Sequence, residues 1–269
     1  MPEGDNIHAL AGRLHAALAG QVLTETDFRT PGLATVDLSG QAVLRARARG
    51  KHLLIETEGG STIHVHLKMD GHVRLYRPHQ LPRGPAHEVR LVLRTRAWTV
   101  CGSRLGVLAL WPSGDEDRRL GHLGPDVLGA GWDPDEAVRR LRADPAREVG
   151  VALVDQRVMA GPGNVYKSEA CFLRGLDPRT PVGAIPDLSA LVDLVKRLME
   201  ANRTRAVRVT TGDTRPGRTL WVYGRAGQPC RRCGEPIGRI RQGAELEDRV
   251  TFLCPSCQRP PLERLGGPS

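Results

Sequence analysis

The second and third residues of the chain, Pro2 and Glu3, could do chemistry at an electrophilic carbon. If Met1 is removed, the Pro2 nitrogen becomes a free secondary amine, and an α-amino group with a pKa near ~8 is partly neutral at pH 7. A neutral amine can attack a carbon on which positive charge is building and so form a covalent intermediate. The Glu3 carboxyl could move protons in such a reaction. The alternative is that both residues belong to a frayed terminus.

Four cysteines toward the other end of the chain follow the pattern C-x2-C-x20-C-x2-C. Two thiolate pairs at this spacing are typical of a tetrahedral Zn²⁺ site. The alternative of two disulfides or free thiols is disfavoured because the sequence shows no secretion signal. The residues between the pairs predict two strands with a turn around 245–248, a hairpin too small to fold without metal. The predicted ligands of one structural Zn²⁺ per chain are Cys230, Cys233, Cys254 and Cys257.

A glycine-rich turn, Gly161-Pro162-Gly163-Asn164, separates two segments with helical periodicity. Asn164 is expected at the N-cap of the second helix, where exposed N–H groups can bind an anion. Lys167, one turn further on, would add positive charge. The alternative is a tight connection between helices with no ligand. Two histidines, His64 and His66, alternate on one predicted strand, but no third metal ligand lies at useful spacing.

The elements that must position these residues fall into an ordered series. Apolar residues at helical spacing predict a helix over 5–19, with Asp5 as its cap and Gly20 at its end. Residues 22–110 alternate in the manner of short antiparallel strands joined by glycine turns, which predicts a sandwich or barrel. Helical patterns follow, and Asp133-Pro134 reads as a cap followed by proline at the first helical position. The predicted fold is α+β with two main domains.

The expected domain boundaries follow from these patterns. They are an N-terminal β-sandwich domain with its leading helix (1–115), a helical domain (116–219), a zinc finger (220–260) and a tail (261–269).

Composition narrows the class of partner. The chain has 269 residues, a formal net charge of +9 and a pI of about 9.8, which favours a polyanionic partner. No stretch is apolar for long enough to span a bilayer, and the N-terminus lacks the pattern of a signal peptide. We therefore expect a cytoplasmic protein without membrane contact.

Several motifs together resemble one family. These are MPEG at the N-terminus, RGK before a strand, HLKMDG, GPGNVYKSE, and a finger with R-x-T-F-x-C before its second cysteine pair. They are similar, in order and spacing from residue 1 to about 258, to the formamidopyrimidine-DNA glycosylase and endonuclease VIII family of bifunctional base-excision repair enzymes. The resemblance implies a β-sandwich domain, a helix–two-turn–helix domain and a zinc finger. It also implies a bacterial, nucleoid-associated protein that binds double-stranded DNA with oxidised bases or abasic sites. We expect a monomer, because one lesion needs only one copy of the protein.

The resemblance also implies roles for single residues. Pro2 would be the nucleophile, Glu3 the acid and base at the sugar, and Lys51 the catalytic lysine near a phosphate. Asn164 and Arg249 would hold DNA phosphates, and Lys167 is expected as a further DNA-binding residue beside Asn164. Met69 matches the residue that fills the gap left by the flipped nucleotide, and a Met packed in the core is the alternative.

One departure from the family pattern concerns the lesion. The guanine-lesion branch has a D-P-R-R-F-G loop, whereas this chain has Cys101-Gly-Ser-Arg-Leu-Gly106. Serine therefore stands where the first arginine would contact the opposite cytosine, and leucine where the phenylalanine wedge would be. We expect an endonuclease VIII-like enzyme that removes oxidised pyrimidines by β,δ-elimination, with tolerance for single-stranded or bubble DNA. The alternatives are a preference for 8-oxoguanine and formamidopyrimidine lesions, a catalytically silent DNA-binding paralogue, or an RNA-binding protein.

Overall fold

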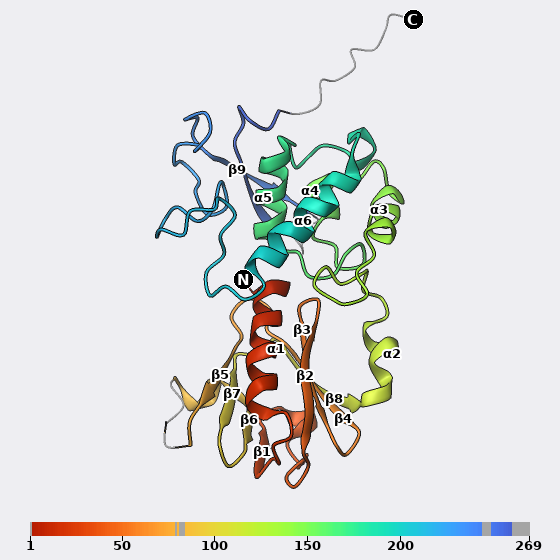
Figure 1. The fold of residues 1–269 in the computed structure, drawn as a ribbon, viewed down its shortest axis with the longest axis vertical. Helices are drawn as coiled ribbons and strands as arrows, with labels where there is room; N and C mark the ends of the chain where they lie inside the picture. Colours follow the sequence, from red (N-terminus) through yellow and green to blue (C-terminus); the bar gives the residue numbers. More distant parts are fainter. Residues whose placement is uncertain (1, 79, 81–83, 244–248, 260–269) are drawn as a thin grey trace, which may run out of the picture. The chain divides into compact units, whose positions relative to one another are not determined.

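A computed structural model describes residues 2–78, 80, 84–243 and 249–259. The chain forms two compact units, residues 1–122 and 123–269, drawn in Figure 1. The predicted turn around 245–248 and the predicted tail 261–269 lie outside the described residues. Among the residues described, no helix has both the length and the apolar character to cross a membrane.

The first unit packs a long helix beside two antiparallel four-stranded sheets, with strand orders β1-β6-β7-β5 and β2-β3-β4-β8. The core between them is aliphatic and includes Leu14, Leu53, Ile63, Leu91 and Val100, each less than 1 % exposed. This confirms the antiparallel β-sandwich that strand alternation predicts. The elements of this unit are α1 (Gly4–Leu18), β1 (Glu25–Phe28), β2 (Val43–Arg49), β3 (His52–Thr57), β4 (Ser61–His66), β5 (His72–Tyr76), β6 (Val89–Arg94), β7 (Thr99–Ser103), β8 (Val107–Pro112) and α2 (Glu116–Leu120).

The N-terminal helix follows the predicted span but starts from a different cap. Glu3, not Asp5, is the N-cap residue, and the side-chain oxygen of Asn6 accepts a hydrogen bond from the Glu3 N–H at 3.3 Å. Asp5 is buried in the first turn instead. The helix starts one residue earlier than predicted, so that its first turn buries two carboxylates. At the other end, Gly20 has φ +75°, the left-handed conformation that suits glycine after a helix.

The helix α2 belongs to the first unit, whereas the sequence predicts that it is part of the helical domain 116–219. The Glu116 carboxylate accepts hydrogen bonds from Arg47 and Arg49 on β2, the latter at 2.9 Å. These bonds hold its pKa at about 2, chiefly through the Arg47 guanidinium. The acidic helix α2 is therefore bound to the sheet by arginines that lie far away in the sequence. The other expected domain boundaries stay predictions.

The second unit is a helical core that carries a two-stranded hairpin. Asp133 caps α3 by accepting from the Glu136 N–H at 3.0 Å, and Pro134 is its first residue, as predicted. α5 and α6 pack on each other around Tyr166 and Leu191, both buried. The elements are α3 (Pro134–Arg142), α4 (Val149–Ala152), α5 (Asn164–Arg174), α6 (Leu188–Asn202), β9 (Gly238–Gln242) and β10 (Arg249–Leu253).

Candidate active site

Pro2 and Glu3 lie at the start of a buried helix and not on a frayed end. Pro2 is half-buried and Glu3 has 0 % of its surface exposed. Because α1 packs against β2 and β3, its first turn has a fixed place in the unit. Glu3 directly follows Pro2 in the chain, and a carboxyl at this position could pass a proton to or from a group bound at the proline nitrogen.

Lys51 is brought to the same end of the first unit. It lies in the turn of the β2–β3 hairpin beside Gly50, which has φ +57°. The Gly20 N–H donates to the Val43 carbonyl at 2.8 Å, so the end of α1 is tied to the start of β2. From that bond the helix runs back about 25 Å to Glu3, and the strand runs about 26 Å to Lys51. Figure 1 shows the hairpin tip and the start of α1 at one end of the unit.

A cluster of three histidines follows Lys51 on β3 and β4. His52 Nδ1 and His64 Nε2 are 2.8 Å apart, His66 lies opposite His52 in the register, and His64 stacks on Trp111. Burial lowers the pKa of His52 to about 3 and the pKa values of His64 and His66 to about 4. The rings are therefore neutral at pH 7. The spacing of His64 and His66 along one strand does not reveal this cluster, because His52 lies on the neighbouring strand.

These histidines should make the first unit sensitive to acid. Each of them gains a proton near pH 6.5 when unfolded but only near pH 4 or below when folded. The free energy of unfolding should therefore fall as pH drops from about 6.5 to about 4, by up to about 1.4 kcal/mol per pH unit and histidine. Urea unfolding at several pH values measures this slope, which His64→Gln should reduce. His87→Gln, on an exposed histidine, is the control, and equal slopes in the two variants would contradict the prediction.

Met69 lies in an exposed turn, as a side chain that inserts into a DNA duplex would require. It lies in the turn between β4 and β5 and is 60 % exposed, so it does not pack in the core. A Cβ on Gly71 would lie 2.9 Å from the Arg104 carbonyl oxygen, so this turn packs closely on the turn after β7. In that second turn Ser103 is buried and Leu105 is half-buried. The two turns that the sequence analysis linked to lesion recognition are thus neighbours.

Asn164 and Lys167 in the second unit both contact the hairpin. Gly163, not Asn164, is the N-cap of α5. Asn164 is the first helical residue, so the helix begins one residue earlier than predicted. The Asn164 amide donates to the Val250 carbonyl at 2.7 Å, while its buried Oδ1 has no hydrogen-bond partner among the described residues. Lys167 is 1 % exposed and its ammonium contacts the Thr251 hydroxyl. This placement assigns Lys167 to the packing of α5 on β10, in place of the expected contact with DNA.

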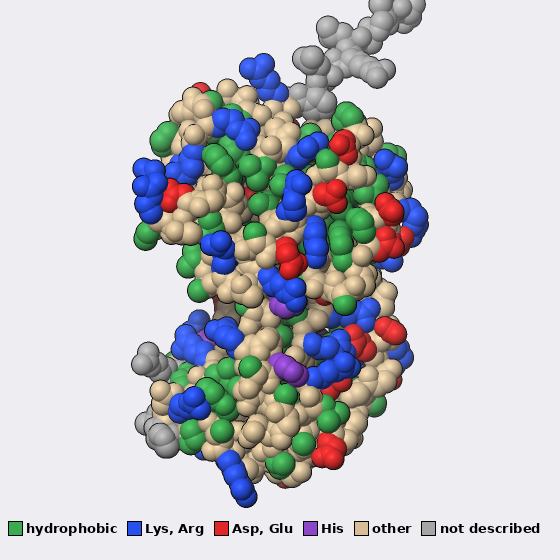
Figure 2. All heavy atoms as spheres, in the orientation of Figure 1, with side chains coloured by type: hydrophobic (Ala, Val, Ile, Leu, Met, Phe, Trp, Pro, Cys, Tyr) green, Lys and Arg blue, Asp and Glu red, His purple; other side chains and the backbone are tan. Residues whose placement is uncertain are grey.

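Arg249 is the first residue of β10, opposite Gln242 in the hairpin register. Because it directly precedes Val250, the bond from Asn164 fixes the backbone next to it. Figure 2 shows lysine and arginine side chains distributed over the face drawn, with acidic side chains among them.

Glu169 is the last residue of the GPGNVYKSE motif, and its role is not among those predicted from the sequence. It is fully buried on α5, and its Oε1 accepts from the N–H groups of Val222 and Tyr223, both at 2.9 Å. Its Oε2 accepts from the Trp221 N–H at 2.8 Å and from the Thr210 hydroxyl. One carboxylate therefore anchors the segment between α6 and the hairpin. The sequence feature that indicates such a role is a glutamate on the apolar face of an amphipathic helix, where a carboxylate needs hydrogen-bond donors.

Removing this carboxylate should destabilise the second unit strongly. Glu169→Ala removes the acceptor of three N–H groups, of which that of Val222 is buried and those of Trp221 and Tyr223 are half-buried, and this should lower the free energy of unfolding by at least about 3 kcal/mol. Glu200→Ala, on α6, removes a half-exposed carboxylate paired with Lys196 and Arg203 and should cost less than about 1 kcal/mol. Chemical denaturation of both variants measures the difference. Equal stabilities would show that Glu169 is not the anchor.

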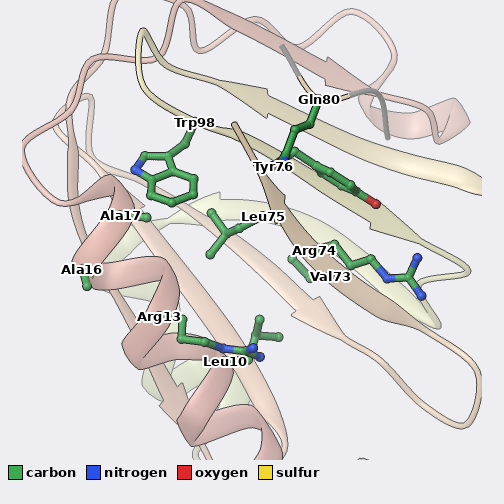
Figure 3. A pocket seen from close by; sticks show the side chains of 10 residues that line it. All are labelled: Leu10, Arg13, Ala16, Ala17, Val73, Arg74, Leu75, Tyr76, Gln80 and Trp98. Atoms are coloured by element: carbon green, nitrogen blue, oxygen red, sulfur yellow. The ribbon is translucent and has the colours of Figure 1, made fainter. Parts of the chain in front are cut away.

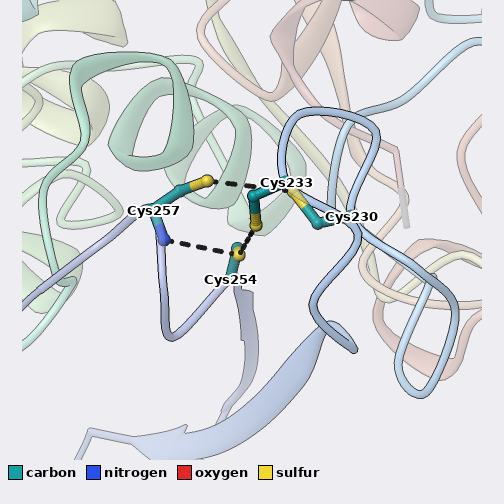
Figure 4. Close-up of side chains that lie close together, drawn as sticks. All are labelled: Cys230, Cys233, Cys254 and Cys257. Atoms are coloured by element: carbon teal, nitrogen blue, oxygen red, sulfur yellow. Dashed lines mark hydrogen bonds between the residues drawn. The ribbon is translucent and has the colours of Figure 1, made fainter.

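The four cysteines converge as their spacing predicts (Figure 4). Their Sγ atoms lie within 4.8 Å of one another, at 3.9 Å between Cys230 and Cys257 and 3.5 Å between Cys233 and Cys254. Tetrahedral zinc with bonds of about 2.3 Å separates its sulfurs by about 3.8 Å, so the residues fit this ion. Backbone N–H groups donate to the Sγ atoms of Cys230 and Cys254 at 3.4 Å. All four cysteines are free of disulfides.

The fold and this site together define a two-unit protein whose N-terminal helix presents Pro2 and Glu3 and whose second unit carries a four-cysteine hairpin. Residues 1–106 match the model of the formamidopyrimidine-DNA glycosylase N-terminal domain. The chain is 53 % identical to a protein named probable endonuclease 8 2 of Streptomyces coelicolor, over 99 % of this chain and 97 % of that protein. It is 48 % identical to the DNA-(apurinic or apyrimidinic site) lyase Nei2 of Mycolicibacterium smegmatis, over 96 % and 99 % of the two chains.

A solved structure shares the fold. The formamidopyrimidine-DNA glycosylase of Lactococcus lactis, in complex with DNA that contains an abasic site, superposes with a TM-score of 0.81. That match covers 96 % of this chain and 100 % of the other at 22 % identity. The chain belongs to the formamidopyrimidine-DNA glycosylase and endonuclease VIII family, on the endonuclease 8 side, which confirms the resemblance seen in its motifs.

Proposed function

We propose that the protein is a bifunctional DNA glycosylase and abasic-site lyase of base-excision repair. The observation that carries this proposal is Pro2 directly ahead of a fully buried Glu3, in a chain 48 % identical to an abasic-site lyase. It acts as a monomer on double-stranded DNA in the bacterial nucleoid. A silent DNA-binding paralogue is disfavoured because Pro2, Glu3 and Lys51 are all present.

The proposed reaction begins at C1′ of the damaged nucleotide. The Pro2 nitrogen attacks C1′, a C–N bond forms, the glycosidic bond breaks and the base leaves with its bonding electrons. The amine proton is lost, the C1′–O4′ bond then opens, and O4′ takes a proton from the Glu3 carboxyl. Because a secondary amine has no second proton to lose, the product is an iminium that stays cationic.

The iminium then drives strand cleavage. Its positive charge acidifies the C2′ hydrogen, so that removal of this proton expels the 3′ phosphate. A second elimination expels the 5′ phosphate, and water hydrolyses the remaining iminium to free Pro2. Lys51, at the tip of its hairpin, stabilises the leaving phosphate by its charge. Glu3 relays the protons.

The second unit would hold the DNA backbone. Arg249 contacts a phosphate from the start of β10, and the second amide hydrogen of Asn164 does the same from the start of α5. The four cysteines would hold one structural Zn²⁺, which would keep the hairpin folded. The bond from Asn164 to the Val250 carbonyl supports this pairing, because it joins the two phosphate-binding positions through one strand.

The experiment that tests the function is incision with reductive trapping. The purified chain should cut a duplex with one abasic site, and borohydride should convert the iminium into a stable protein–DNA adduct. A chain that binds the abasic duplex tightly but neither cuts nor traps it would be the silent paralogue. Tight RNA binding that does not depend on a lesion would indicate that the protein is instead an RNA-binding protein.

Lesion choice gives a separate prediction. Ser103 is buried and uncharged where the guanine-lesion branch has an arginine, and the exposed Met69 is left to fill the gap in the duplex. We therefore expect faster release of thymine glycol than of 8-oxoguanine opposite cytosine, by at least about tenfold in rate, equivalent to about 1.4 kcal/mol. Single-turnover kinetics on matched duplexes measure the ratio. Faster cutting of 8-oxoguanine would place the enzyme in the other branch, and bubble substrates test the tolerance for unpaired DNA.

A further inference from the structure

A groove of about 930 Å³ opens in the first unit between α1 and β5. Figure 3 shows its lining, with α1 along one side and Leu75 and Trp98 in the middle. The floor is mainly aliphatic, through Leu10, Ala17 and Val73. None of the candidate catalytic or DNA-binding residues lines it, so the proposed reaction gives it no purpose.

The groove follows the edge of a sheet. β5 is the last strand in the order β1-β6-β7-β5 and pairs only with β7 among the described residues. Side chains from both faces of β5 line the groove, with Val73 and Leu75 from one face and Arg74 and Tyr76 from the other. Residues 73–75 make no backbone hydrogen bond beyond this pairing in the part of the chain that the structure describes. In an antiparallel pair alternate residues direct N–H and C=O away from the partner, so this edge offers both.

The charges around the groove have one sign. Arg13 on α1 and Arg74 on β5 are both exposed, and neither forms an ion pair with any described residue. The Arg77 guanidinium lies 3.8 Å from the centre of the Trp98 ring, which adds a third cation at the rim. Among the residues that the structure describes, no acidic side chain lines the groove. A ligand that fits must therefore bring negative charge together with apolar groups.

We propose that this groove binds an extended acidic segment of a partner protein, which adds a strand to β5. A carboxylate on one face of the segment pairs with Arg74, and an apolar side chain on its other face lies on Leu75 and Trp98, because Arg74 and Leu75 belong to opposite faces of β5. Strand addition explains why the open backbone edge and the apolar floor occur together, since main-chain bonds give affinity and pockets give specificity. A DNA strand would use the arginines, but it has no use for an aliphatic floor or for alternating backbone donors and acceptors.

The test uses the full-length protein and a labelled, acetylated and amidated peptide of about seven residues that alternates aspartate with isoleucine or phenylalanine. Fluorescence anisotropy should detect binding, and hydrogen exchange should show new protection of the amides at 73–75. Arg74→Glu should weaken the affinity by at least about tenfold. Arg96→Glu is the matched control, because Arg96 is equally exposed in the turn before β7 but does not line the groove. It should change the affinity by less than about twofold.

Two further measurements separate the possible outcomes. A peptide methylated on alternate backbone nitrogens should lose binding if the β5 edge takes part. Incision of abasic DNA should be unchanged in Arg74→Glu, because Arg74 is outside the proposed active site. The proposal is overturned if Arg74→Glu and Arg96→Glu have equal effects, or if residues 73–75 gain no protection. It is also overturned if a single-stranded oligonucleotide of equal charge protects these residues and the peptide does not.

Discussion

The chain in which alanine replaces Pro2 should form much less borohydride adduct and should cut abasic DNA at least about a thousandfold more slowly, a loss of about 4 kcal/mol of transition-state stabilisation. The physical reason is that alanine has a primary and proline a secondary amine at the N-terminus. Alanine presents a primary amine, whose imine can lose its proton and with it the charge that acidifies C2′. Proline gives an iminium that cannot be neutralised in this way. Gel assays of trapping and incision on one abasic duplex measure both losses.

Two controls keep this result specific to the nucleophile. Pro2→Ala should bind a reduced, uncleavable abasic analogue within about threefold of the original affinity, because α1 begins at Gly4 and its packing does not depend on the proline ring. Mass spectrometry should show that Met1 is absent from active protein. Equal cutting by protein with an acetylated N-terminus would falsify the proposed mechanism while leaving the family assignment intact.

Removal of zinc should have the second large effect. Structural zinc contributes on the order of 10 kcal/mol to folding of modules of this kind, so a strong chelator or Cys254→Ser should unfold the β9–β10 hairpin. Because Asn164 and Lys167 hold the hairpin through Val250 and Thr251, the contact surface for DNA should be lost with it. We expect affinity for abasic DNA to fall at least about a hundredfold.

The measurements separate the hairpin from the rest of the chain. A chromogenic chelator should release one zinc ion per chain, and hydrogen exchange should show loss of protection at 250–253 with α1 unaffected. Cys101→Ser is the matched control, because Cys101 is also buried but lies on β7 in the other unit. Protein that contains no metal and keeps a protected hairpin would contradict the zinc assignment.

The sequence predicts a structural feature well where all the residues that produce the feature lie in one short segment. The predicted start of α3 at Asp133-Pro134 is confirmed, because the capping hydrogen bond and the first-turn proline both lie within four consecutive residues. The predicted convergence of the four cysteines is confirmed, because a tetrahedral zinc site uses two pairs of thiolates at short sequence spacing. The cap of α1 was assigned to Asp5 and belongs to Glu3, since two acidic residues two positions apart satisfy the same pattern.

What the sequence determined by itself is the family, the order of its elements and the residues that could do the chemistry. Only the tertiary structure decided how buried polar side chains are used. Glu169 binds a segment some fifty residues away, Lys167 turns into the hairpin, and His52 completes a cluster with the neighbouring strand. Helix and strand patterns report which face is buried, but they do not report which distant donor or acceptor meets a side chain there. That pairing depends on how the elements pack.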